Sequence, residues 1–397
     1  MARRARTETA GSFAPEVSTR PGARAFAEIA ARSKSFRPAR DVLRRVRAVP
    51  TIFPGLDHKL RVGGWPIDRV AMVHGPSGKG KTTFAQGVGL SFLQRRHMYA
   101  FIDAEMTTPV PWLSTLFGQY VDDPRFIASR PMSFEQAVDD VRKVSDAVGE
   151  AREKGSIEKE TTCLFVVDSL GKLVPLDIQA KIKRFAAESA AGSVDGYRGA
   201  SGMIKAALNK SWLDQLVPQM YATGCAMLFI VRESQDRNAS ADDQKWDRAW
   251  KTTGGGSLFY DSSLAIRVSD AQVIHELPRT TEGWRKSPVV GERHVVDILK
   301  TKVSARLDET ERTSFNVSNG LWTPEGFDRA RDLLDLGEDL DVIKRGGAWI
   351  AFGGKRFQGE RRFLQGSTPE YLDALEAACR AKFSADVAKR SDIVGGA

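Results

Sequence analysis

The chain has 397 residues, of which 42% are hydrophobic and 27% are charged, and its formal net charge is +9. This composition is ordinary for a globular protein, and no apolar run reaches the length of about 18 residues that a membrane-spanning helix needs. Three widely spaced cysteines and five scattered histidines argue against a disulfide framework and against a regularly spaced zinc site. We therefore expect a cytoplasmic protein with no membrane partner.

The first fifty residues carry most of the positive charge, with 12 Lys and Arg against 4 Asp and Glu. Residues 1–20 are poor in apolar side chains, which is typical of a disordered basic arm. Such an arm either contacts nucleic acid or stays solvated, and both interpretations remain open. Residues 21–50 combine apolar side chains with many arginines, which predicts one or two amphipathic helices.

Residues 75–82 read Gly-Pro-Ser-Gly-Lys-Gly-Lys-Thr, which fits the pattern of a phosphate-binding loop. The loop follows a strand predicted over 69–74 and precedes a helix predicted over 81–94, as the pattern requires. Glycines let backbone N–H groups turn inward around a phosphate, while Lys81 adds charge and the Thr82 hydroxyl can hold Mg²⁺. The predicted nucleotide contacts are Gly75, Pro76, Ser77, Gly78, Lys79, Gly80, Lys81, Thr82 and Thr83.

Beyond the loop, predicted strands and helices alternate. The further strands are at 98–103, 125–129, 162–167 and 225–231, and the further helices are at 109–119, 133–154 and 202–222. This alternation predicts an α/β fold with a mostly parallel central sheet that helices cover on both faces. Two long polar stretches, 177–201 and 233–256, interrupt it, and long loops in a compact domain are usually functional or disordered.

The last third of the chain changes character. Strands are predicted at 263–268, 272–276, 294–299 and 312–318. A small α+β unit begins near residue 324, with a helix around 326–336, short strands and a final helix at 368–384. Its cations either bind DNA or form a solvated face; they are Lys344, Arg345, Lys355, Arg356, Arg361 and Arg362.

Two carboxylates follow predicted strands at the same edge of the sheet. The run 164–169, Leu-Phe-Val-Val-Asp-Ser, has the form of a Walker B strand, which places Asp168 near Mg²⁺. The run 101–105, Phe-Ile-Asp-Ala-Glu, ends an earlier strand. Glu105 can there orient the water that attacks a phosphate, or it can simply stabilise a helix N-terminus.

The two polar stretches carry cations, and the second also carries tryptophans. Cations interleaved with aromatic rings suit phosphate contact and stacking on unpaired bases. The alternative is that the tryptophans pack locally. The predicted DNA contacts from these stretches are Lys181, Lys183, Arg184, Arg198, Lys245, Trp246, Arg248, Trp250 and Lys251.

Several segments together resemble the RecA recombinase family and its phage-encoded members. They are residues 65–87, Phe-Ile-Asp-Ala-Glu at 101–105, Val-Val-Asp-Ser-Leu at 166–170, Thr-Thr-Gly-Gly at 252–255, Leu-Leu-Asp-Leu-Gly at 333–337 and Gly-Ala-Trp at 347–349. The resemblance covers residues 50–384, with the motifs in the family's order. It implies an enzyme that binds ATP and Mg²⁺, forms helical filaments on single-stranded DNA, and catalyses homologous pairing and strand exchange with duplex DNA.

The resemblance also implies a domain organisation. A helical segment over 21–50 packs on the adjacent subunit of the filament, and the ATPase core covers 51–320. A domain over 324–385 gathers duplex DNA, and a flexible tail covers 386–397. Besides DNA and further copies of the chain, the implied partners include a single-strand-binding protein or a mediator.

Residue roles carry over by position. Glu105 matches the family's catalytic glutamate, and Trp112 lies where the family often has an aromatic residue near adenine. Lys300 and Lys302 match a lysine pair that reaches the ATP of a neighbouring subunit; from the residues themselves, a shared anion or a solvated strand end explains the pair. The second DNA-binding loop of the family adds Thr252, Thr253, Gly254 and Gly255.

The chain also departs from the family's pattern. Arg232 stands where the family usually has a glutamine that senses the γ-phosphate; an arginine can still contact phosphate, but the switch then differs. Phe259 replaces an interface lysine, and Pro109 replaces an acidic residue near adenine. These departures indicate a divergent bacterial or phage member.

Two alternative functions remain open. One is a hexameric motor with a RecA-type core, such as a helicase. The other is an accessory DNA-binding protein without turnover, against which the intact Lys81, Thr82, Glu105 and Asp168 argue.

Overall fold

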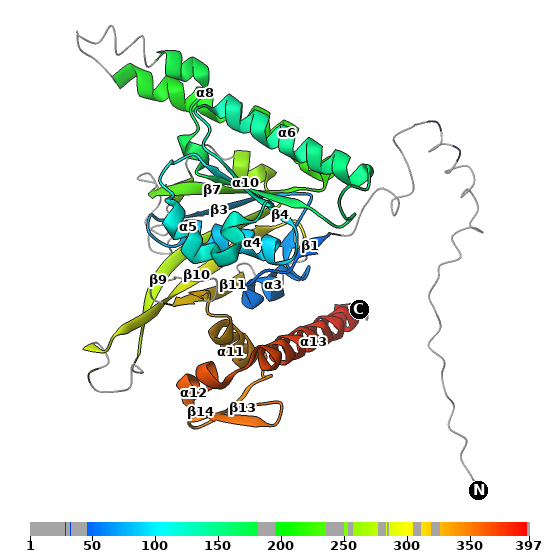
Figure 1. Ribbon diagram of the computed structural model, residues 1–397, viewed down its shortest axis with the longest axis vertical. Helices are drawn as coiled ribbons and strands as arrows, with labels where there is room; N and C mark the ends of the chain where they lie inside the picture. The colour runs from blue at the N-terminus through cyan, green and yellow to red at the C-terminus, as the bar shows by residue number, and fades with distance from the viewer. Residues whose placement is uncertain are drawn as a thin grey trace. The chain divides into compact units, whose positions relative to one another are not determined.

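Apolar segments of the chain form the central sheet in the computed structural model. The strands are β3 (Val70–Gly75), β4 (Met98–Asp103), β5 (Phe126–Ser129), β6 (Cys163–Asp168), β7 (Ala226–Gln235), β8 (Trp250–Thr252), β9 (Leu264–His275), β10 (Val289–Thr301) and β11 (Glu311–Ser318). Within the described residues the sheet has nine strands in the order β11-β10-β9-β3-β7-β6-β4-β5, with β8 beside β7 (Figure 1). The six strands from β9 to β5 run parallel, while β10, β11 and β8 are antiparallel additions. The predicted α/β class with a mostly parallel sheet is confirmed.

The structure describes residues 28, 32, 46–181, 195–235, 250–252, 257–276, 283, 286–304, 311–318 and 326–394. The chain divides into two units, Met1–Val46 and Arg47–Ala397, and every element named here belongs to the second. The predicted basic arm and almost all of the predicted N-terminal helical segment lie outside the described residues.

Helices cover both faces of the sheet. Two clusters of buried apolar side chains lie between the sheet and these helices, one on each face. Helices of the first cluster are α3 (Pro54–Leu60), α4 (Lys81–Gln94) and α5 (Val110–Phe117), and helices of the second are α6 (Phe134–Glu153), α8 (Asp195–Thr223) and α10 (Ser257–Asp261). Strand β6 shows the division: Leu164 and Val166 join the first cluster, whereas Phe165 and Val167 join the second. Because successive strand residues point to opposite faces, a strand covered on both sides must be apolar throughout.

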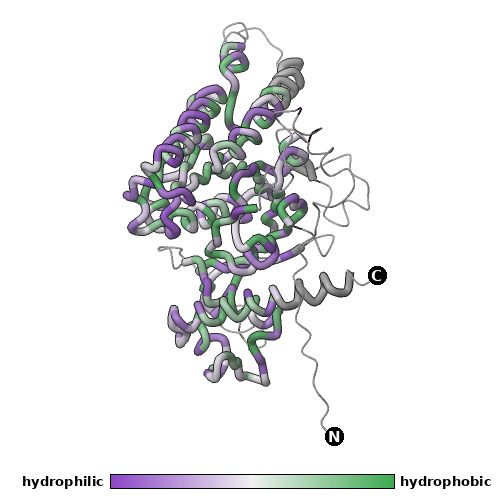
Figure 2. The backbone as a smooth tube through the Cα atoms, turned by 90° about the vertical axis from the view of Figure 1, so that its right-hand side faces the viewer, coloured by the Kyte–Doolittle hydropathy of each residue, from purple (hydrophilic) through white to green (hydrophobic). Residues whose placement is uncertain are grey.

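Helix α6 illustrates how the outer layer forms. The Ser133 hydroxyl caps its first turn by accepting a hydrogen bond from the Gln136 backbone N–H at 3.1 Å. Phe134, Ala137 and Val141 recur at helical spacing and are buried against the sheet. The alternation of hydrophilic and hydrophobic residues along such outer helices is visible in Figure 2.

The C-terminal part has a small core of its own. It contains α11 (Arg329–Asp339), β12 (Lys344–Gly346), β13 (Trp349–Phe352), β14 (Lys355–Gln358), α12 (Gly359–Gly366) and α13 (Pro369–Val394). The three strands form an antiparallel sheet, and Leu333, Ile350 and Phe363 centre a separate apolar cluster. Helices α11 and α13 also pack against α3.

The structure differs from the predicted elements in several places. The two strands predicted at 263–268 and 272–276 are one strand, β9, and the final helix continues past residue 384 to Val394. Helix α8 begins at Asp195, inside the first predicted loop, and β8 pairs with the end of β7 inside the second. Strands pair through backbone hydrogen bonds, which polar residues can also form. The polar composition of the second stretch therefore gave no indication that β8 would pair with β7.

None of the helices in the described part of the chain has the length and apolar character needed to cross a membrane.

Candidate functional site

The phosphate-loop segment turns from β3 into α4. Gly78 and Gly80 have φ values of 74° and 86°, in the left-handed region that favours glycine. At Gly80 a Cβ atom would lie 2.8 Å from the His294 ring, so a side chain there would also clash. Lys81, Thr82 and Thr83 in the first turn of α4 line the pocket, and that turn has no acidic residue, so the electropositive end of the helix can receive an anion there.

Lys81 begins α4 and folds back over the loop. Its Nζ donates a hydrogen bond to the Pro76 carbonyl at 2.6 Å. Burial lowers the pKa of Lys81, and the nearby carboxylates of Asp168 and Glu233 oppose that effect. The hydrogen bond to Pro76 holds the Lys81 side chain against the inner curve of the loop.

Thr82 and Asp168 form an oxygen pair beside the loop. The Thr82 hydroxyl donates a hydrogen bond of 2.7 Å to the Asp168 carboxylate, although 86 positions separate them in sequence. Burial raises the pKa of Asp168 to about 6, against the lowering effect of the Thr82 hydrogen bond. A cation at this carboxylate would favour its ionised form. A hydroxyl and a carboxylate next to a phosphate site fit Mg²⁺, which usually binds one or two carboxylates together with substrate phosphates.

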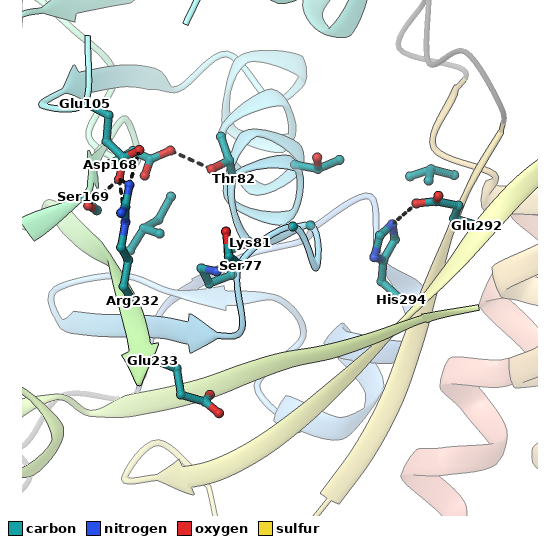
Figure 3. A pocket seen from close by; sticks show the side chains of 15 residues that line it. Ser77, Lys81, Thr82, Glu105, Asp168, Ser169, Arg232, Glu233, Glu292 and His294 are labelled. Atoms are coloured by element: carbon teal, nitrogen blue, oxygen red, sulfur yellow. Dashed lines mark hydrogen bonds and ion pairs between the residues drawn. The ribbon is translucent and has the colours of Figure 1, made fainter. Parts of the chain in front are cut away.

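Glu105 lies on the opposite side of this pair from the phosphate loop's helix (Figure 3). Its backbone N–H donates to the Asp168 carbonyl at 3.0 Å, which ties the ends of β4 and β6 together. Its carboxylate accepts hydrogen bonds from the Ser169 hydroxyl at 2.7 Å and from the Arg232 guanidinium at 2.9 Å. The predicted catalytic carboxylate and the predicted phosphate-sensing cation are thus in direct contact.

These groups line one pocket of about 730 Å³. The phosphate loop with the start of α4 and the carboxyl ends of β4, β6 and β7 form most of its lining, and β10 and β11 contribute the rest. The predicted residues that line it are Ser77, Gly78, Gly80, Lys81, Thr82, Thr83, Glu105, Asp168 and Arg232. Ligands of open parallel sheets usually bind at this edge, where the carboxyl ends of the strands meet.

The pocket also contains residues that the sequence did not single out: Ser169, Ile230, Glu233, Glu292, His294 and Val317. Ser169 adjoins Asp168 in a run already quoted, so its position was a usable signal. His294 comes from β10, and its Nδ1–H donates to the Lys79 carbonyl at 3.1 Å while its ring stacks on Phe315. Burial lowers the pKa of His294, while Glu292, 3.5 Å from its Nε2, opposes that effect. The hydrogen bond to Lys79 links β10 to the phosphate loop.

Comparison with known proteins assigns this site to a family. The family model described as the RecA N-terminal domain matches residues 37–320. The chain belongs to the RecA family. This confirms the family that the sequence motifs predicted.

Several curated RecA proteins are similar over most of their length. Protein RecA of Geobacter sulfurreducens is 27% identical over 343 residues, which cover 85% of this chain and 86% of that protein. Protein RecA of Nitratidesulfovibrio vulgaris is 28% identical over 336 residues, which cover 84% of this chain and 80% of that protein. Protein RecA of Desulforapulum autotrophicum is 26% identical over 344 residues, which cover 85% and 84%.

Trp112 of this RecA-family chain does not line the pocket in the described part of the structure. It lies in α5, partly buried against the apolar cluster that includes α4. The predicted contact between Trp112 and adenine therefore stays a prediction.

Lys300 and Lys302 lie near the end of β10, away from the described pocket. The Lys300 ammonium donates to the Phe259 and Tyr260 carbonyls at 2.5 and 2.7 Å, and the Lys302 ammonium donates to the Tyr260 carbonyl at 3.0 Å. These carbonyls belong to α10, whose C-terminal end is electronegative. The lysine pair thus has an acceptor within its own chain, which the sequence did not suggest.

Only some of the predicted DNA-contact residues belong to the described part of the chain. Lys181 is exposed, Arg198 belongs to α8, and Trp250, Lys251 and Thr252 form β8. The others lie outside the described residues: Lys183, Arg184, Lys245, Trp246, Arg248, Thr253, Gly254 and Gly255.

Cations of the C-terminal part gather around its small sheet. Arg356 stacks over the Trp349 ring at 5.3 Å, and Trp349 is 41% exposed. Lys355 lies 5.3 Å from the Tyr371 ring. Arg345 pairs with Glu338 and Glu360, whereas the remaining cations make longer or single contacts: Lys344 with Asp341, Arg361 with Glu276 and Arg362 with Gln358.

Proposed function

We propose that this RecA-family protein is a DNA-dependent ATPase that forms helical filaments on single-stranded DNA and catalyses homologous pairing and strand exchange. The observation that carries the ATPase part is the convergence of Lys81, Thr82, Asp168 and Glu105 in one pocket. The DNA part rests on family membership, on the cations of the two long stretches and on the cations around Trp349.

The pocket suggests a role for each side chain. Lys81 binds the β- and γ-phosphates, and backbone N–H groups of the loop and α4 hold them in place. Thr82 and Asp168 would hold Mg²⁺, which when bound neutralises charge that develops on the phosphates. Glu105 orients the attacking water and accepts its proton.

We assign the other functions to separate parts of the chain. The core over 51–320 hydrolyses ATP, the segment over 21–50 packs on the adjacent subunit, and the C-terminal domain over 324–385 gathers duplex DNA, with a flexible tail over 386–397. The protein then acts in a bacterial or phage-infected cytoplasm, where a single-strand-binding protein or a mediator is a natural partner.

The deciding experiment measures ATP hydrolysis with and without single-stranded DNA and images the same samples by electron microscopy. We expect DNA-stimulated hydrolysis and helical filaments on the DNA. Closed rings would instead favour a hexameric motor. DNA binding without turnover would favour an accessory protein.

A first prediction concerns Trp246 in the second predicted DNA loop. Trp246→Ala should weaken single-stranded DNA binding by about 1–3 kcal/mol because a base loses its stacking partner. Fluorescence anisotropy with a labelled oligonucleotide measures this. Affinity should also fall steeply with salt, since Lys and Arg release counterions from the phosphates. Unchanged affinity in a folded Trp246→Ala protein would indicate that the tryptophan packs locally.

A second prediction concerns the lysine pair on β10. We propose that Lys300 and Lys302 exchange the α10 carbonyls for the γ-phosphate bound by a neighbouring subunit, where they stabilise transition-state charge. The double variant Lys300→Ala/Lys302→Ala should bind ATP through Lys81 but lose DNA-stimulated turnover. Because α10 also loses two capping cations, circular dichroism must first show that the variant is folded.

Subunit mixing separates this trans role from a purely structural one. Combining the double-lysine variant with Glu105→Gln should restore part of the activity, because some mixed interfaces join an intact Glu105 to intact lysines. Mixtures that co-assemble yet show no recovery at any ratio would contradict the trans role.

A further inference from the structure

The carboxylate of Glu105 is occupied by donors on both oxygens. Its Oε1 accepts from the Ser169 hydroxyl at 2.7 Å and from the Arg232 Nε and Nη2 at 3.2 and 2.9 Å. Its Oε2 accepts from the Arg232 Nη2 at 2.9 Å. A carboxylate offers about four lone-pair sites, and this arrangement leaves few of them for water.

This contact opposes the proposed role of Glu105 as a base. The Ser169 hydroxyl and the Arg232 guanidinium occupy lone-pair sites of the carboxylate that an attacking water would need. To act as proposed, Glu105 must first lose the guanidinium.

The backbone next to Arg232 is firmly anchored, whereas its side chain is not enclosed. The neighbouring Glu233 accepts from the Arg267 guanidinium at 2.8 and 3.0 Å and from the His74 Nδ1–H at 3.3 Å. All three of these side chains are buried, and β7 pairs with β3 so that Arg232 stands opposite Gly75. The Arg232 side chain is 55% exposed. A change of partner therefore requires movement of the guanidinium and not of the strand.

The pocket suggests a terminal phosphate as the alternative partner of the Arg232 guanidinium. Arg232 and Lys81 line the same pocket, and Figure 3 shows the Arg232 guanidinium turned toward Glu105, with Lys81 to one side of it. A terminal phosphate held at Lys81 would therefore enter the pocket that Arg232 also lines. A guanidinium binds phosphate with the same two-pronged geometry as carboxylate, and a terminal phosphate carries more negative charge.

We infer that Arg232 is a nucleotide-operated latch on Glu105: it pairs with the carboxylate until a terminal phosphate draws the guanidinium away and leaves Glu105 to receive the attacking water. The inference rests on the proposed ATPase function and adds how its base is kept inactive and then released. Arg232 is in this view a positioning residue for Glu105 and a contact to the third phosphate.

Crystal structures of the full chain test the exchange directly. One structure would contain Mg²⁺ and ADP, and the other Mg²⁺, ADP and aluminium fluoride, which imitates the transferred phosphoryl group. We expect the Arg232–Glu105 pair to persist with ADP and to be replaced by an Arg232–fluoride contact in the second structure. A guanidinium still paired with Glu105 beside bound aluminium fluoride would overturn the latch.

Nucleotide affinities give an independent test in solution. Arg232→Ala should weaken binding of a non-hydrolysable ATP analogue roughly tenfold or more, by loss of a charge-assisted contact, while ADP affinity stays unchanged. Arg130→Ala is the matched control: Arg130 is also 55% exposed and pairs with a carboxylate at the end of β4, that of Asp103, but it does not line the described pocket. If Arg232 has only a structural role, the substitution should lower the affinities for ADP and for the ATP analogue equally. That result would refute the latch.

The two proposals fail in different ways. If wild-type protein binds neither nucleotide, the ATPase function itself is wrong. If it binds and hydrolyses ATP while Arg232→Ala keeps the wild-type ratio of ADP to ATP-analogue affinity, only the latch is wrong.

Discussion

Glu105→Gln should lower the maximal rate of ATP hydrolysis by roughly 100- to 10,000-fold, which is the usual contribution of a positioned general base. The amide keeps the size of the side chain and can still accept from Ser169, but it cannot take a proton from water. Nucleotide binding should persist, since Lys81, Thr82 and Asp168 are untouched. Stopped-flow or coupled-enzyme assays at saturating ATP and DNA measure the rate.

Glu150→Gln is a suitable control for this experiment. Glu150 is exposed on α6 and pairs with Lys154, so the same chemical change there should leave hydrolysis unaffected. Wild-type turnover in Glu105→Gln would mean that another group activates the water. Loss of nucleotide binding in this variant would mean that Glu105 serves the architecture of the pocket instead.

The second large effect is expected at Lys81. Lys81→Ala should abolish productive ATP binding, because the β- and γ-phosphates lose their main side-chain cation. Hydrogen bonds to charged groups contribute about 1.5–3 kcal/mol each, so affinity measured by isothermal titration calorimetry should fall by at least that amount. ATP hydrolysis should fall to background.

A neighbouring lysine in the same loop makes the comparison sharp. Lys79 contributes its backbone carbonyl to the contact with His294, and this carbonyl survives in Lys79→Ala. We expect a much smaller loss of affinity from Lys79→Ala than from Lys81→Ala. Equal losses would show that the loop's overall charge binds the nucleotide, in place of one directed ammonium group.

Part of the site could be predicted because its signals are local. A phosphate loop needs glycines, a lysine and a threonine within eight consecutive residues, between a strand and a helix. The position of Asp168 at the pocket could be predicted because it ends an apolar strand, and the ends of parallel strands meet at one edge of a sheet. Resemblance to a family then added roles such as that of Glu105, which local spacing leaves ambiguous.

The partners of these groups could not be predicted in this way. Arg232 and Glu105 are 127 positions apart, and His294 reaches the phosphate loop from 215 positions away. Neither pair shares a periodicity or a motif, so nothing in the order of residues indicates the contact. The lysine pair on β10 gave the same difficulty, since its carbonyl acceptors on α10 depend on how the helix packs beside the strand.

The amino-acid sequence by itself determined the α/β class, the family, the phosphate loop and the strand-end carboxylates, because each depends on short-range pattern and composition. Only the tertiary structure decided that the Arg232 guanidinium is paired with Glu105 and that buried Arg267 and His74 fix its neighbour Glu233. The physical reason is that hydrogen bonds and ion pairs act over about 3 Å in space. The order of the strands in the sheet decides which groups come that close. That order depends on contacts between distant segments, so no single segment of the sequence predicts it.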